Sequence, residues 1–257
     1  MILRYLILML YMMNLANASV PGKEFSADAV MTIPGQKKTI SKLFVGKNVV
    51  RTEVNTQEGL MVDIVLPLQG KLIKINTGLK QYIEIPIEKK SADGITKINP
   101  CNRMQYATCT QLADESINGR NTQKWQIISI QQGRNVRTLH WIDVDRQLAV
   151  REFFNDGSMA EMTLEKIETI NNRKTEKWVR KISRPDGSTI SSYQWYDPQL
   201  EISIKESLPG GYVRELKNIK ISSQKGDLFK IPGDYEMIRQ TMPSVSTVQP
   251  YRQAISR

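Results

Sequence analysis

The residues with the chemistry for catalysis are few and widely spaced. His140 is the only histidine of the chain. A serine triad would need it beside an activated serine and a carboxylate, and the sequence contains no Gly-x-Ser-x-Gly turn. Two acidic pairs, Asp143 with Asp145 and Asp114 with Glu115, have the residue type for acid–base work, but turn and loop positions account for them more simply. We therefore predict no catalytic residue and a protein that is not an enzyme.

The two cysteines predict a structural disulfide. Cys101 and Cys109 are an even number, and in an oxidising compartment such a pair is expected to be bonded. A redox-active pair usually has two residues between the sulfurs, whereas seven separate these. Closing this loop stabilises the fold by about 2.5 kcal/mol in the chain-entropy model. Two cysteines and one histidine do not form a recognisable metal site, so we expect neither a metal nor a cofactor.

The N-terminal residues predict a signal peptide over 1–18. Arg4 gives a basic start, residues 5–13 form the apolar run YLILMLYMM, and the sequence ANA ends at Ala18. This small-x-small pattern places cleavage between Ala18 and Ser19. The apolar run is too short to span a bilayer as a helix, which takes about 20 residues. We expect a periplasmic protein, secreted with cleavage of this segment.

The net charge indicates which partners are compatible with this compartment. The chain has 36 basic and 26 acidic residues, a formal charge of +10 at pH 7. A positive excess favours acidic partners, which in the envelope are anionic lipid head groups or acidic polymers. No nucleic-acid motif is present, and we expect no nucleic-acid partner. The basic residues are spread along the chain, so solvation of exposed strand faces explains them as well.

Most of the chain predicts short antiparallel strands. Runs rich in β-branched and aromatic residues alternate with turns that hold Gly, Pro or Asn. The first six runs are 24–33, 39–45, 49–54, 60–66, 71–76 and 81–87. Residues 88–116 break this rhythm, and the only segment with the composition of a short helix is 102–116. The pattern therefore predicts an all-β, antiparallel fold with minor helix.

A phrase of the sequence occurs twice. Residues 117–125 read INGRNTQKW, and residues 170–178 read INNRKTEKW. Each phrase opens a unit of four predicted strands, over about 117–167 and about 170–221. The four tryptophans of the chain all lie in these units and correspond in pairs: Trp125 with Trp178, and Trp141 with Trp195. Leu148 corresponds to Leu200, Asp143 corresponds to Asp197, and the offset between the copies drifts only between 52 and 54. We expect the copies to lie side by side in one curved sheet.

The hairpin series resembles a known family, the LolA-like proteins, which include the lipoprotein-sorting carriers LolA and LolB. The resemblance covers about 24–238 and is carried by the strands from FSADAVMTI to QYIEIPI, by INGRNTQKW, and by DLFKIPGDYEMI at 227–238. It implies an unclosed antiparallel β-barrel, or strongly curved sheet, over a cavity that holds acyl chains and is capped by helices. In this chain Trp178, Arg180 and Ile182 share one strand face, so part of that face is expected to be mixed.

The resemblance implies the following organisation and function. Residues 19–238 form one domain, and the composition of 239–257, with three arginines, two prolines and no acidic residue, separately predicts a loosely held tail. The tryptophans Trp125, Trp141, Trp178 and Trp195 line the ligand cavity. The protein carries a lipid or lipidated protein on the concave face of the sheet, so its partners are an anionic lipid, an acyl chain or a lipoprotein. The alternative is an envelope interaction or sensor module that docks a membrane-protein partner without a small ligand.

Overall fold

The protein is built on one large, strongly bent sheet. The computed structural model describes residues 22–87, 89, 99–103, 107–131, 133–146 and 148–238. Within these residues the strands are β1 (Phe25–Thr32), β2 (Thr39–Gly46), β3 (Val49–Thr56), β4 (Gly59–Leu66), β5 (Lys71–Asn76), β6 (Gln81–Pro86), β7 (Ala107–Ile117), β8 (Arg120–Gln131), β9 (Arg134–Asp143), β10 (Ala149–Phe153), β11 (Met159–Ile170), β12 (Arg173–Ser183), β13 (Thr189–Asp197), β14 (Ile202–Leu208), β15 (Tyr212–Ile221) and β16 (Glu236–Met237). Four short 3₁₀ turns accompany them: η1 (Pro67–Gln69), η2 (Pro100–Arg103), η3 (Pro209–Gly211) and η4 (Gly226–Phe229).

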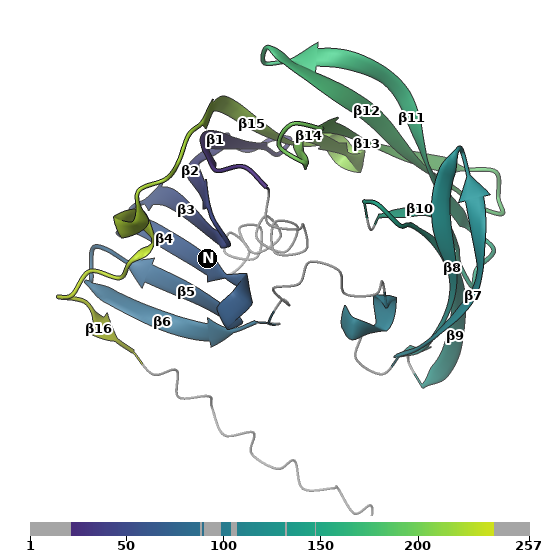
Figure 1. Ribbon diagram of the computed structural model, residues 1–257, viewed down its shortest axis with the longest axis horizontal. Helices are drawn as coiled ribbons and strands as arrows, with labels where there is room; N and C mark the ends of the chain where they lie inside the picture. The colour runs from purple at the N-terminus through teal and green to yellow at the C-terminus, as the bar shows by residue number, and fades with distance from the viewer. Residues whose placement is uncertain are drawn as a thin grey trace, which may run out of the picture.

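The strand order shows two meanders joined in the middle. The sheet runs β16-β6-β5-β4-β3-β2-β1-β15-β14-β13-β12-β11-β10-β9-β8-β7. Neighbours are antiparallel throughout, except that β16 adds to β6 in parallel. Pairing of β1 with β15 joins the N-terminal meander to the C-terminal one. The sheet bends into an open arch (Figure 1), so the predicted all-β, unclosed antiparallel sheet is confirmed.

Local sequence explains why the strands lie where they do. Eight-residue strands such as β1 alternate buried and half-buried positions, which is the pattern of a sheet whose two faces differ. The turn between β7 and β8 needs positive φ at two positions, and Asn118 (51°) and Gly119 (74°) supply it. The equivalent turn between β11 and β12 uses Asn171 (50°) and Asn172 (61°). The predicted strand runs and the two four-strand blocks, β8–β11 and β12–β15, correspond to observed strands.

The predicted helix in 102–116 is wrong for the described part of that stretch. Residues 107–117 form β7, which pairs with β8 over most of its length, and helical structure is limited to η2. Thr108 and Thr110 are β-branched, and the segment lacks the apolar stripe that would hold a helix against the sheet. Cross-strand pairing therefore decides its conformation. Residues 104–106 lie outside the described residues.

Some predictions concern segments that lie outside the described residues. They are the signal peptide 1–18, its cleavage between Ala18 and Ser19, and the tail 239–257. Within the described chain, none of the helices is long and apolar enough to cross a membrane.

The segment after β15, residues 222–238, crosses the outside of the arch (Figure 1), and we call it the strap. It contains η4 and β16. Phe229 of the strap packs tightly over Gly46, where an added Cβ would lie 2.8 Å from the phenyl ring. Phe229, Ile231 and Tyr235 pack against a buried apolar cluster on β3, β4 and β5. The strap therefore closes the outer side of this part of the sheet.

Candidate binding site

The cross-strand registers assign every side chain of the sheet to one of two faces. Residues directly opposite each other in antiparallel strands point to the same side, and side chains alternate along each strand. The strap packs on Val49, Val62, Ile64, Ile73 and Ile75, so these residues face outward. Their sequence neighbours face the inside of the arch.

One half of the inner face is apolar. A single register row crosses six adjacent strands from β1 to β6: Phe25, Val45, Val50, Val65, Leu72 and Ile85. The row belongs to a larger buried cluster that continues through Leu200, in the turn before β14, onto β14 and β15 with Ile202, Ile204 and Leu216. All described strands belong to one sheet, so no second described sheet packs on this side. Such a wall is suited to contact with hydrocarbon.

The other half of the inner face is mixed. Its register row reads Trp125, His140, Glu152, Ala160 and Ile182 across β8 to β12. His140 Nδ1 lies 3.4 Å from Glu152 Oε1, and the hydroxyl of Thr138 is 2.9 Å from His140 Nε2. Arg180 donates to Glu152 from the next strand but one. The expectation that charged side chains interrupt an apolar inner face is therefore met here.

Burial controls the protonation of His140. Desolvation lowers the pKa of the imidazole, Glu152 opposes this effect, and Arg180 reinforces it. The ring is therefore neutral near pH 7, with Thr138 and Glu152 as its polar neighbours. The hydroxyl of Thr138 and the carboxylate of Glu152 lie beside opposite nitrogens of the ring, and Glu152 is also bound by Arg180.

The two inner tryptophans have different surroundings. The indole N–H of Trp178 donates to Glu176 over 3.0 Å, and Arg120 stacks on the ring with its Cζ 4.2 Å from the centroid. The indole N–H of Trp125 is buried and has no hydrogen-bond partner among the described residues. Arg146 also pairs with Glu176, the acceptor of the Trp178 N–H, over 2.6 Å. Trp178 is thus held at its N–H edge and over one ring face, whereas no described residue accepts a hydrogen bond from the N–H of Trp125.

The other two tryptophans face outward, which corrects the expectation that all four line one inner cavity. Trp141 follows His140 and Trp195 follows Gln194, so strand alternation turns both rings away from the arch. The indole N–H of Trp141 donates to Glu115 over 2.7 Å, and Lys124 Nζ lies 4.8 Å from its ring centroid. Trp195 has the same surroundings, with its N–H donating to Glu168 and with Lys177 and Lys205 over the ring. The lysine stems cover both rings, which are 7% and 8% exposed.

The structure explains most of the residues that the two copies of the repeated segment, 117–125 and 170–178, share. The asparagine makes the positive-φ turn, the arginine bonds the aspartate at the end of the next strand, and the threonine hydroxyl donates to a carbonyl seven residues earlier. The lysine covers the outer tryptophan and the final tryptophan faces inward. The pairs are Asn118 and Asn171, Arg120 and Arg173, Thr122 and Thr175, Lys124 and Lys177, and Trp125 and Trp178. Each of these five pairs has a structural role, and the sixth shared pair, Ile117 and Ile170, packs in apolar clusters.

Two of the acidic residues considered for catalysis, Asp143 and Glu115, have structural contacts. The carboxylate of Asp143 accepts the backbone N–H groups of Asp145 and Arg146, at 2.8 and 2.9 Å. Glu115 accepts from Lys124 and Trp141, and these two hydrogen bonds lower its pKa. Among the described residues, no three of the His, Cys, Asp and Glu side chains are placed to hold a metal ion.

The predicted disulfide is present. Cys101 of η2 is bonded to Cys109 of β7, with 5.7 Å between the Cα atoms. It fixes the start of the C-terminal meander to the connection that precedes it.

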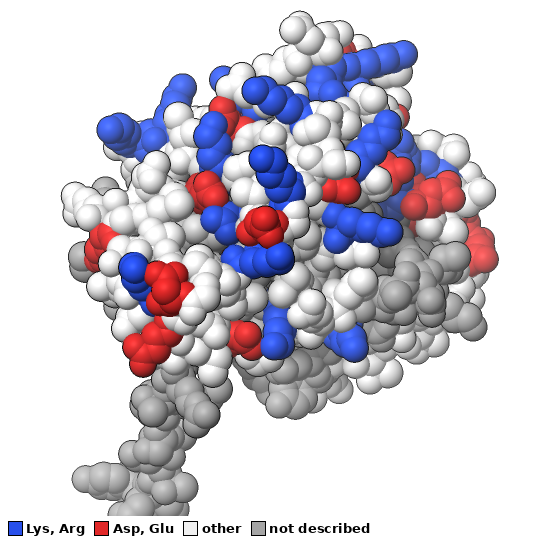
Figure 2. Space-filling model, turned by 60° about the vertical axis from the view of Figure 1, so that its left-hand side comes forward, with Lys and Arg blue, Asp and Glu red and all other residues white. Residues whose placement is uncertain are grey.

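Charge is distributed over the surface rather than concentrated. Figure 2 shows lysine and arginine side chains interspersed with acidic ones over one side of the molecule. Many of them are paired across strands, as Lys42 is with Asp28 and Lys71 with Glu84. The positive net charge therefore does not by itself define a docking surface.

Comparisons with known proteins concern the fold. No family model and no curated protein matches the sequence. A LolA superfamily protein from Nitrosomonas europaea has a similar structure, with 10% identity, a TM-score of 0.35, and coverage of 84% of this chain and 93% of that one. A putative outer membrane lipoprotein-sorting protein domain from Vibrio parahaemolyticus has 9% identity and a TM-score of 0.35, with coverage of 81% of this chain and 89% of that one. A chain of the MucA/MucB complex from Pseudomonas aeruginosa has 10% identity and a TM-score of 0.21, with coverage of 83% of this chain and 98% of that one. The protein is similar to these structures in outline, and what it binds is inferred from its own residues.

Proposed function

We propose that this protein is a periplasmic, non-enzymatic carrier that binds a lipid or a lipidated protein on the concave face of its sheet. The observation that supports this most directly is the apolar row from Phe25 to Ile85, which crosses six strands without a polar residue. Each methylene that an acyl chain buries there contributes about 0.8 kcal/mol. Partial burial of a chain therefore gives affinity that is useful and still reversible, as a carrier requires.

The division of the inner face suits an amphiphile. The apolar half offers a surface for hydrocarbon, and the mixed half around His140 and Arg180 offers polar contacts to a head group. The periplasmic location follows from the predicted signal peptide. Sequencing the N-terminus of protein purified from the envelope fraction tests it, and the expected first residue is Ser19.

The two pairs of tryptophans provide a test of the binding face. The double variant W141F/W195F retains only the inner tryptophans, and W125F/W178F retains only the outer ones. A fatty acid brominated along its chain quenches the tryptophans that it contacts. We expect strong quenching in the variant that keeps Trp125 and Trp178, and weak quenching in the variant that keeps Trp141 and Trp195.

Equal quenching of both variants, or of neither, would contradict binding on the inner face. Mass spectrometry of organic extracts from the unsubstituted protein gives an independent readout. We expect co-purified lipid, and its consistent absence together with no uptake of a fluorescent fatty acid counts against the carrier function.

A second candidate function is docking of a membrane-protein partner. Within the described part of the chain, β7 ends the sheet, and its 11 residues are paired on one side only. Such an edge can accept an extended peptide as an additional strand. Proline substitution in the middle of β7, T110P, is expected to abolish capture of such a partner while lipid uptake by the inner face continues.

A further inference from the structure

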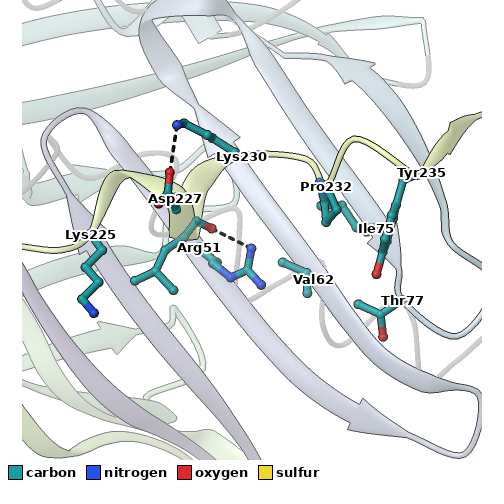
Figure 3. A pocket seen from close by; sticks show the side chains of 10 residues that line it. Arg51, Val62, Ile75, Thr77, Lys225, Asp227, Lys230, Pro232 and Tyr235 are labelled. Atoms are coloured by element: carbon teal, nitrogen blue, oxygen red, sulfur yellow. Dashed lines mark hydrogen bonds and ion pairs between the residues drawn. The ribbon is translucent and has the colours of Figure 1, made fainter.

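A second cavity lies on the opposite face of the sheet from the apolar row. It has a volume of about 270 Å³, is open to solvent on one side, and lies between the outer face of β3, β4 and β5 and the strap (Figure 3). The strap is fixed above it by apolar packing and by the pairing of β16 with β6. Lys80 and Asp234 form an ion pair, 2.8 Å long, near the end of the strap. The cavity is therefore a built feature and not a gap beneath a loose segment.

The lining divides into an apolar part and a cationic part. Val62, Ile75 and Pro232 contribute hydrocarbon, and Tyr235 borders the same end (Figure 3). Arg51, Lys225 and Lys230 contribute positive charge, with Asp227 as the acidic side chain of the lining. A ligand that fills this space has to satisfy both parts.

Arg51 is the central polar group. Its side chain is only 14% exposed. Nη1 donates to the carbonyl of Leu228 in the strap over 2.7 Å, and Nε donates to Glu53 over 2.7 Å. A guanidinium has five N–H donors, so these two contacts leave three without an acceptor among the described residues. A guanidinium with free donors in a partly buried site favours a carboxylate or a phosphate.

The charges around the cavity also favour an anion. Lys225 forms no ion pair or hydrogen bond with any described residue, whereas Lys230 pairs with Asp227 at 2.8 Å. The site thus contains three cationic groups, Arg51, Lys225 and Lys230, and two carboxylates, those of Glu53 and Asp227. Among these five described groups, positive charge exceeds negative charge by one.

We propose that this cavity binds a small amphiphilic anion, a carboxylate or phosphate on a short alkyl chain. The anionic group contacts Arg51, and the alkyl chain lies on Val62, Ile75 and Pro232. The volume falls just below the ~300 Å³ at which sites for drug-sized ligands begin, so a lipid with two long chains does not fit. This site is distinct from the concave face, since Arg51 and Val62 point away from the arch.

The test is a calorimetric titration of the full protein with four probes. Hexanoate and hexyl phosphate carry both a charge and a chain, and inorganic phosphate and hexan-1-ol each carry one of them. We expect saturable binding of one or both amphiphiles, with the two half-ligands at least about tenfold weaker because each leaves one part of the lining unsatisfied. The better of the two amphiphiles identifies the head group.

Three variants locate the binding. R51K keeps the charge but removes the planar fork of donors, and affinity is expected to fall about tenfold or more. K225Q removes the unpaired amine at an exposed position, where the fold is not at risk, and a fall of about threefold is expected. K37Q makes the same charge change in the exposed turn between β1 and β2 and is expected to leave affinity unchanged.

Two results would overturn the proposal. One is the absence of saturable binding of either amphiphile to the unsubstituted protein. The other is equal affinity in the unsubstituted protein and in K225Q and R51K, which would place the ligand elsewhere, including the concave face. Neither result bears on the tryptophan quenching that tests the carrier function, so the two proposals fail independently.

Discussion

The two four-strand blocks, β8–β11 and β12–β15, share a scaffold but differ on the inner face. In both blocks an arginine at the start of the first strand pairs with a buried aspartate at the end of the second, Arg120 with Asp143 and Arg173 with Asp197. Each aspartate also accepts two backbone N–H groups of the following turn. The network that fixes the strand ends is thus the same twice.

The differences lie at positions that this network does not use. Facing the inner tryptophan across the strands is His140 in the first block and Gln194 in the second. Two residues before that tryptophan stands Gln123 in the first block and Glu176 in the second. The Arg–Asp network of the strand ends is thus kept in both blocks, while the polar residues beside the inner tryptophan differ between them.

The largest expected difference between the blocks concerns the leucine after the aspartate turn. Leu200 is fully buried in the apolar cluster, whereas Leu148, its counterpart after a turn two residues longer, is 38% exposed. Replacing a fully buried leucine by alanine costs about 4 kcal/mol, because hydrocarbon contact is lost and a cavity remains. L200A is therefore expected to lower the free energy of unfolding by about this amount, and L148A by less than about 1 kcal/mol. Urea denaturation measures both, and similar losses would show that the blocks are packed alike.

The aspartates test whether the shared network is equally important in both blocks. D143A and D197A each leave an arginine and two turn N–H groups without their acceptor. Each is expected to cost about 3 kcal/mol, since the remaining charge is partly buried. D186A is the matched control, because Asp186 accepts one N–H, that of Ser188, in an exposed hairpin and should cost about 1 kcal/mol or less. If only one of the two variants lost little unfolding free energy, the network would not be equally important in the two blocks.

The inner tryptophans should respond differently to the same substitution. W178F removes an indole N–H that donates to Glu176, whereas W125F removes a buried N–H for which the described residues provide no acceptor. Loss of apolar contact is similar in both, so the difference reflects the hydrogen bond. W178F is expected to cost about 1 to 2 kcal/mol more than W125F. The reverse order in thermal or urea unfolding would mean that the Trp125 N–H has an acceptor in solution.

The sequence predicts the scaffold of these blocks better than their faces. The strands, the Trp and Asp positions at the strand end and the disulfide follow from local patterns, because turn residues and alternation act over a few residues. Which tryptophans face the arch depends on the register of many strands, and neither Trp125 nor Trp141 reveals this by its neighbours. The strap cavity depends on a contact between Arg51 and Leu228, 177 residues apart. The phrase DLFKIPGDYEMI signals the end of the domain but not the surface on which it packs.

The smallest expected difference concerns pH. Burial lowers the pKa of His140 below its ordinary 6.5, and its counterpart Gln194 does not titrate. Because the unfolded chain then takes up the proton at a higher pH than the folded protein, the contribution of His140 to stability is complete above about pH 6.5 and falls as the pH drops below it. Glu152 weakens this effect and Arg180 strengthens it.

H140Q gives the first block the residue of the second and should remove this dependence. Urea midpoints measured between about pH 7.5 and 5.5, above the range where most carboxylates titrate, are expected to fall less in H140Q than in the unsubstituted protein. The glutamine amide can still form a hydrogen bond with Glu152. A loss of stability that is the same at every pH would therefore come from altered packing and not from titration of the side chain. Equal slopes in the two proteins would mean that His140 is solvated when folded, and that the inner face at Trp125 is open to water where that at Trp178 is not.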